Sequence, residues 1–190
     1  MLKRKITAIF MAMIACQSVF ANNEQNQQIA EKVAYIHAGG TIFNQLLNTE
    51  YQKLDKQNIP IAKKQIFECL LNHSNDTTYA QFLLPLIADF MQNKTKSEIQ
   101  AYQAALSDKK LLELVRNISL SKSGMTNYGT DYYTKQLKMY ENVENVTVLY
   151  KLATLGGATT SQAEYLGRRM SDEYTGYILR ECNMFNLQGA

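Results

Sequence analysis

Apolar residues recur at helical spacing along most of this 190-residue chain. Between residues 24 and 54 they fall three, four or seven positions apart, as Ile29, Val33, Ile36, Phe43, Leu47 and Leu54. This spacing places the side chains on one face of an α-helix. Strand-like alternation is scarce, and only two prolines occur. The pattern therefore predicts an all-α protein, a single irregular bundle of about six or seven helices that follows a cleaved signal peptide.

Capping signals bound the expected helices. They span residues 24–54, about 60–72, 76–93, 95–106, 107–120, about 131–155 and about 162–182. Thr95 and Glu98 form a capping box, and Asp76 and Ser107 are the expected N-caps of their helices. The Gly39–Gly40 pair interrupts the first helix, where it marks either a kink or the close approach of another helix.

The first 21 residues have the features of an export signal. Lys3, Arg4 and Lys5 form a basic start, and an apolar run follows over residues 6–15. This run is shorter than the roughly 20 apolar residues that cross a bilayer, and it fits the hydrophobic region of a secretory signal. We therefore expect a signal peptide over 1–21 and one helical domain over 22–190, with residues 22–28 as a disordered lead-in.

Two cleavage sites compete in this segment. Val19 and Ala21 are small residues that suit a cut before Asn22, which would release the chain into the periplasm. Alternatively, "MIAC" is a lipobox, and Cys16 then anchors the protein to the membrane as a lipoprotein. Beyond the signal no apolar run reaches spanning length, because polar residues and Pro85 break the most apolar stretch.

The excess of basic residues belongs to the export signal. The full chain has 20 Lys and Arg against 17 Asp and Glu, and removal of residues 1–21 leaves 17 of each. A nucleic-acid-binding surface needs a basic stripe that neutralises phosphates, and no long cluster of Lys or Arg remains. The composition therefore argues against nucleic acid as a partner.

Two cysteines, Cys69 and Cys182, remain after the signal. In an oxidising compartment this pair predicts a disulfide, and the alternative is two separate buried thiols. His73 lies four residues after Cys69 on the same helix face, an arrangement that also suits a thiol nucleophile or half of a zinc site. The disulfide would remove the free thiol, and a zinc site would need further ligands when only His37 remains among the histidines. We therefore expect no catalytic residue, no metal and no cofactor.

His37 is expected to be a partly exposed helix histidine, although its place beside Gly39–Gly40 also suits a residue that caps a helix or lines a small pocket. Tyr128, Tyr132 and Tyr133 gather at a polar linker. They form either a partner surface, because tyrosine offers a large contact area at low entropy cost, or part of the core.

Arg168 and Arg169 each precede an acidic residue by four positions. This spacing indicates a solvated helix face with ion pairs, and the alternative is a charged partner surface.

One segment carries a family resemblance. A capped helix, a short turn and a second helix contain, in order, Thr95, Glu98, Tyr102, Ser107 and Lys110. Over residues 95–120 this order resembles a family of small secreted, all-helical bacterial proteins of unknown function. That family usually has a glycine where this chain has Lys109, and a Phe-Tyr pair where it has Ala101–Tyr102. The resemblance implies a periplasmic helical module and assigns no activity.

These features predict an exported, non-enzymatic helical binding or accessory protein of the bacterial cell envelope, with another envelope protein as its partner. The alternative is a periplasmic immunity or inhibitor protein that neutralises a toxin or lytic enzyme. A thiol enzyme built on Cys69 and His73 is a third hypothesis.

The intact mass of the protein from cells tests the export prediction. We expect a chain that starts at Asn22 and gains the mass of two hydrogen atoms on reduction, because Cys69 and Cys182 are joined. A chain that starts at an acylated Cys16 would establish the lipoprotein alternative, and an unchanged mass on reduction would contradict the disulfide.

Overall fold

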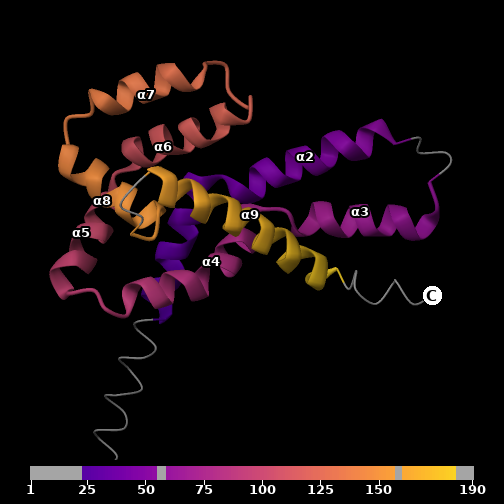
Figure 1. Cartoon of the computed structure of the whole chain (residues 1–190), viewed down its shortest axis with the longest axis horizontal. Helices are drawn as coiled ribbons and strands as arrows, with labels where there is room; N and C mark the ends of the chain where they lie inside the picture. The colour runs from indigo at the N-terminus through magenta and orange to yellow at the C-terminus, as the bar shows by residue number, and fades with distance from the viewer. Residues whose placement is uncertain (1–22, 55–58, 157–159, 183–190) are drawn as a thin grey trace, which may run out of the picture.

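Nine helices and no strand make up the parts of the chain that the structure, a computed structural model, describes: residues 23–54, 59–156 and 160–182. The first helix spans residues 23–37. It is followed by α2 (Gly39–Lys53), α3 (Ile61–His73), α4 (Asp76–Met91), α5 (Lys96–Ser107), α6 (Lys109–Lys122), α7 (Thr130–Lys138), α8 (Val143–Ala153) and α9 (Thr160–Glu181) (Figure 1). The all-α prediction is confirmed, and the predicted number of helices is close but too low.

The number differs because two expected helices each divide. The helix predicted over 24–54 breaks at Ala38, whose left-handed φ of 52° redirects the chain before α2 begins. The helix predicted over 131–155 stops after Lys138. Asn142 then begins α8 as an N-cap whose side chain accepts a hydrogen bond from the Asn145 backbone, 3.0 Å away.

The helix starts confirm one capping prediction and correct two. Thr95 and Glu98 form the expected capping box of α5. The N-cap of α4 is Asn75 and not Asp76, and that of α6 is Asp108 and not Ser107, which ends α5. In both cases the neighbour of the expected residue is the cap. The Asn75 side chain accepts the backbone N–H of Thr78 at 2.8 Å, and the Asp108 side chain accepts that of Leu111 at 3.1 Å.

The N-terminal part of the domain is also more ordered than expected. Helix begins at residue 23, where the sequence analysis placed a disordered lead-in over 22–28. Gln27 donates to Glu31 one turn later at 2.9 Å, and Ile29 and Ala30 are buried. Burial of this face stabilises the helix from its first turn.

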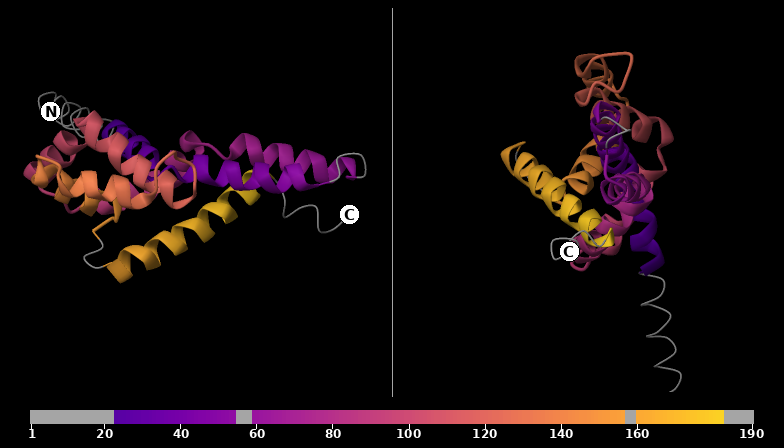
Figure 2. Two further views of the ribbon diagram at one scale, coloured as in Figure 1. Left: turned by 90° about the horizontal axis from the view of Figure 1, so that it is seen from above. Right: turned by 90° about the vertical axis from the view of Figure 1, so that its right-hand side faces the viewer.

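The core surrounds the first helix. Ile29, Val33 and Ile36 are buried in one cluster with apolar side chains of α3, α4, α5, α6, α8 and α9. Helices α2 and α3 form an antiparallel pair that extends to one side, and α6 with α7 forms another (Figures 1 and 2). Within the described ranges, no helix has the length and apolarity that a membrane span requires.

A polar junction joins the first helix to α2, α4 and α6. We call it the Asp76 junction; its residues are Tyr35, Thr41, Asp76 and Arg116. The carboxylate of Asp76 accepts the backbone N–H of Thr41 at 3.0 Å and its hydroxyl at 3.1 Å. Arg116 donates to the same carboxylate at 2.9 Å and to the Thr41 hydroxyl at 3.1 Å. The Arg116 guanidinium also donates to the Tyr35 carbonyl. Its central carbon lies 4.4 Å from the centre of the Tyr35 ring.

Gly40 lets α2 approach the start of α4. A Cβ at this position would lie 2.1 Å from the carbonyl carbon of Asn75 and 2.5 Å from the backbone nitrogen of Asp76. The close-approach interpretation of the glycine pair is therefore confirmed, and the neighbouring Ala38 provides a bend as well.

Substitution of this glycine tests the packing. Gly40→Ala should lower the free energy of unfolding by about 2–3 kcal/mol, because rigid backbone has to move away from the new methyl group. Gly176→Ala is the matched control: it lies inside α9, its Cβ would meet only the far end of Arg180 at 3.7 Å, and it should stabilise by about 0.5–1 kcal/mol. Urea unfolding measures both, and equal effects would contradict the packing described.

Candidate functional site

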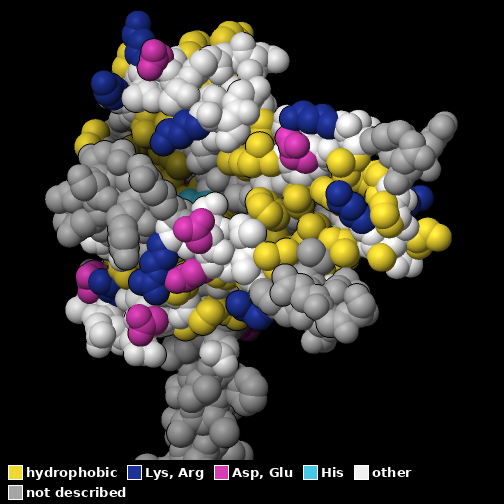
Figure 3. All heavy atoms as spheres, turned by 45° about the vertical axis from the view of Figure 1, so that its right-hand side comes forward, with side chains coloured by type: hydrophobic (Ala, Val, Ile, Leu, Met, Phe, Trp, Pro, Cys, Tyr) yellow, Lys and Arg dark blue, Asp and Glu magenta, His cyan; other side chains and the backbone are white. Residues whose placement is uncertain are grey.

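A half-open cavity of about 550 Å³ lies between the first helix and α6, α7 and α8. Apolar side chains dominate its lining, among them Ile36, Val115, Ile118, Leu137, Val146 and Leu149. Its volume falls within the range of roughly 300–1,000 Å³ that is usual for ligand pockets. Figure 3 shows a hollow with apolar side chains and a histidine in its depth.

Helical spacing directs these side chains into the cavity. Val115, Ile118 and Lys122 recur at three and four along α6, and Val146, Leu149 and Ala153 do so along α8. Of the three side chains that α7 directs at the cavity, Thr130 and Thr134 are short and only Leu137 is large, which leaves space open. None of the residues of α7 is fully buried, so this helix covers the cavity without filling it.

His37 lies at the cavity with both ring nitrogens engaged by the protein. Nε2 is 2.9 Å from the Ala153 carbonyl, which can only accept, so Nε2 carries the proton and donates it. Nδ1 is then an acceptor, and the Tyr79 hydroxyl lies 3.4 Å from it. Burial lowers the pKa of His37, and the bond to Ala153 offsets only part of this effect. The imidazole is therefore neutral near neutral pH.

Tyr79 is held in its protonated form on the other side of this pair. Burial is the main cause that raises its pKa, and the negative charge of Asp76 adds to the effect. Its ring packs edge-on against Tyr174, with the ring centres 4.7 Å apart. The His37–Tyr79 pair is thus a neutral polar patch in an otherwise apolar site, and Lys122 is the one charged residue among the described side chains that line the cavity.

The structure brings Cys69 and Cys182 together. They form the predicted disulfide, with Cα atoms 5.9 Å apart, which ties α3 to the residue that follows α9. His73 lies beside them, one turn after Cys69. A thiol nucleophile at Cys69 is not available in this oxidised form.

The three tyrosines of the expected partner surface also lie together. The rings of Tyr128 and Tyr132 stack with centres 4.4 Å apart, and Tyr133 meets Tyr132 edge-on at 5.2 Å. Tyr128 and Tyr132 are 56% and 45% exposed, so these two rings do not fill the core. Their stacking leaves an aromatic surface at the start of α7.

Of the remaining predicted positions, one lies in the part of the chain that the structure describes and the others lie outside it. Arg169 is exposed on α9 and forms the expected ion pair with Glu173, at 2.6 Å. The side chain of Arg168 and the residues Cys16, Ala21 and Asn22 lie outside the part that the structure describes.

His37 is half-buried, in line with the expected partly exposed histidine, but the sequence did not show that both of its ring nitrogens have partners. Its partner Ala153 is 116 residues away in the chain, and a carbonyl acceptor leaves no trace in the sequence. The available signal was the adjacent glycine pair, which had suggested a pocket as the alternative.

The lowered pKa of His37 predicts that the free energy of unfolding depends on pH. The unfolded chain protonates this residue near pH 6.5, whereas the folded chain does so only at lower pH. The unfolded state therefore binds more protons between the two values, and the free energy of unfolding falls as the pH falls through this window. His37→Gln keeps a donor for Ala153 and should remove this contribution. Urea unfolding from pH about 7 to about 5 measures the difference in the free energy of unfolding between the wild type and His37→Gln. A difference that stays constant over this range would contradict the lowered pKa of His37.

Comparisons with protein-family models, with curated proteins and with solved structures found no match for this chain. The resemblance of residues 95–120 to secreted helical proteins therefore stays a prediction.

Proposed function

We propose that this chain is an exported, non-enzymatic binding protein of the bacterial cell envelope that holds a small apolar ligand in the cavity between α6, α7 and α8. The observation that carries the proposal is the cavity itself. It combines a mostly apolar lining with a few polar groups, which is the usual composition of a small-molecule site. Apolar contact would supply affinity. The Tyr79 hydroxyl, whose oxygen can still accept a hydrogen bond while it donates to His37, would orient a polar group of the ligand.

The state of the polar groups supports binding and not catalysis. Both nitrogens of His37 already have protein partners, so the ring has no free position from which to remove a proton from a substrate. Cys69 is joined to Cys182 and offers no thiolate. The catalytic candidates of the sequence were Cys69 and His73, and the disulfide leaves His73 without a thiol to activate.

A second surface supports an interaction with another envelope protein. Tyr128 and Tyr132 present stacked, exposed rings beside the cavity cover α7, and Tyr133 packs against both. Aromatic residues are enriched where proteins recognise each other. We propose this tyrosine cluster as the partner surface, which would equally serve the inhibitor alternative.

The expected export signal supports the proposal that both surfaces work in the periplasm. The basic start and apolar run before Asn22 fit a secretory signal, and the Cys69–Cys182 pair suits an oxidising compartment. Cys16 remains the alternative point of attachment to the membrane.

Two matched tryptophan variants on α8 test the cavity. Val146 lines the cavity, whereas Val143 is 67% exposed one turn earlier. We expect the mature protein to bind the probe 1-anilinonaphthalene-8-sulfonate at one site by titration calorimetry. Val146→Trp should weaken this binding at least about ten-fold, because the indole occupies the cavity, and Val143→Trp should leave it unchanged.

Circular dichroism and thermal unfolding of both variants establish that they are folded. Equal affinities for the wild type and Val146→Trp, or no binding by the wild type, would contradict the proposed site.

A further inference from the structure

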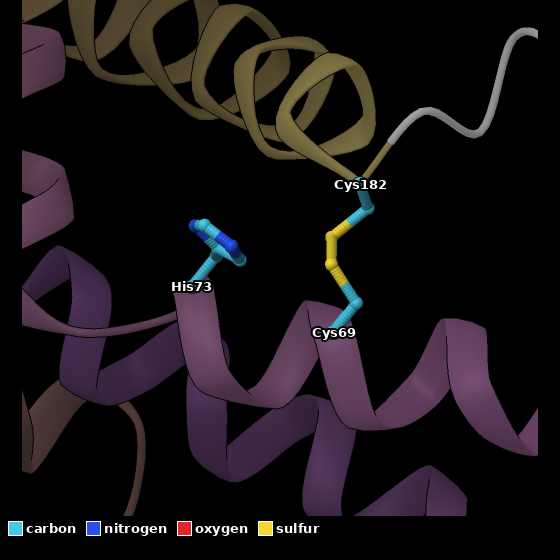
Figure 4. A group of neighbouring side chains, drawn as sticks. All are labelled: Cys69, His73 and Cys182. Carbon is cyan, nitrogen blue, oxygen red and sulfur yellow. A yellow bond between two sulfur atoms is a disulfide. The ribbon is translucent and has the colours of Figure 1, made fainter.

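Three metal-ligating side chains converge where the end of α3 meets the end of α9. Cys69 and His73 project from the same face of α3, and Cys182 reaches them from the residue after α9 (Figure 4). The two sulfurs and a ring nitrogen of His73 all lie within 4.8 Å of one another. All three residues are half-buried, so an ion could reach the group from solvent and still be partly shielded from it.

We propose that reduction of the Cys69–Cys182 disulfide creates a binding site for one zinc ion, held by the two thiolates and His73. Two cysteines and one histidine are a ligand set that suits zinc, with a water in the fourth position. The sequence paired Cys69 with Cys182 as a disulfide and with His73 as half of a zinc site; the fold brings all three ligand atoms together, with Cys182 113 residues from Cys69.

The distances fit tetrahedral zinc after small side-chain rotations. With Zn–S near 2.3 Å and Zn–N near 2.0 Å, tetrahedral coordination places the sulfurs about 3.8 Å apart and each sulfur about 3.6 Å from the nitrogen. The three ligand atoms already lie within 4.8 Å of one another, so rotation of the side chains is enough to reach these values once the disulfide is reduced. The Cα atoms of the two cysteines, 5.9 Å apart, do not have to approach further.

The chemistry balances with one external dithiol. The dithiol is oxidised to its own disulfide, and its two hydrogens pass to the sulfurs of Cys69 and Cys182. Zinc then binds as the two thiols release their protons, while neutral His73 contributes a lone pair. The tie between α3 and α9 is thereby kept in both redox states, as a covalent bond when oxidised and as a metal bridge when reduced. This site shares no residue with the residues given for the cavity, and neither proposal depends on the other.

Cobalt binding tests this site, because Co²⁺ reports its own ligands. The full mature protein is reduced with a phosphine and titrated with Co²⁺ under nitrogen. We expect one equivalent to bind with a thiolate-to-cobalt charge-transfer band and the strong visible absorption of tetrahedral Co²⁺, and one equivalent of Zn²⁺ to abolish both. The oxidised protein should show neither band.

His73→Ala separates the complete site from two thiols alone. This variant should bind Co²⁺ at least about ten-fold more weakly, since even partners that only orient a ligand change affinity by that much. Asn72→Ala, at the exposed neighbouring position, is the control and should bind like the wild type. Wild-type affinity in His73→Ala, binding by the oxidised protein, or loss of the helical circular-dichroism signal on reduction would each overturn the proposal.

Discussion

The arrangement of the first helix, α2, α4 and α6 depends on the hydrogen bonds that the Asp76 carboxylate accepts. It accepts two hydrogen bonds from Thr41 and one from Arg116, and so joins α4 to α2 and α6. The guanidinium extends the junction to the first helix through Tyr35. A charge-assisted bond of this kind is worth about 1.5–3 kcal/mol, towards the lower value here because the Asp76 and Arg116 side chains retain 26% and 17% exposure.

The Asp76 junction also sets the geometry of the cavity. Ile36 and His37 follow Tyr35 directly, and Val115 precedes Arg116, so residues next to the junction line the cavity from two helices. Gly40 is part of the same constraint, because only a residue without a Cβ lets Thr41 reach Asp76. The disulfide holds the same end of α3 to the residue after α9. It closes a loop of 113 residues, and this restriction of the unfolded chain stabilises the fold by up to about 4–5 kcal/mol.

Local signals in the sequence predicted the features that depend on local physics. The apolar spacing predicted the helices, and the Thr95–Glu98 box predicted the start of α5. The disulfide was predicted from a count, because two cysteines remain beyond the expected signal. The N-caps were misplaced by one residue because adjacent polar residues compete for the same role. Asp76 is used by Thr41 and Arg116 instead, and this requirement arises only from the tertiary fold.

The features that could not be predicted from the sequence depend on residues that are distant in the chain. The left-handed backbone of Ala38 is imposed where α2 turns to meet α4, although alanine favours helix. His37 acquires its burial and its tautomer from Tyr79 and Ala153. The sequence predicts that Cys182 pairs with Cys69, but the position of His73 beside both sulfurs follows only from the way the residue after α9 meets the end of α3. In each case the contact crosses tens of residues, which the pattern of a single segment does not record.

The central claim is that the cavity between α6, α7 and α8 binds a ligand. The most direct measurement of it is methyl-resolved NMR of residues 22–190 with 1-anilinonaphthalene-8-sulfonate. Ile36, Ile118 and Val146 provide methyl groups on three helices that line the cavity. We expect nuclear Overhauser effects from the probe to all three. Contacts confined to exposed apolar residues such as Ile61 and Val143 would contradict the claim.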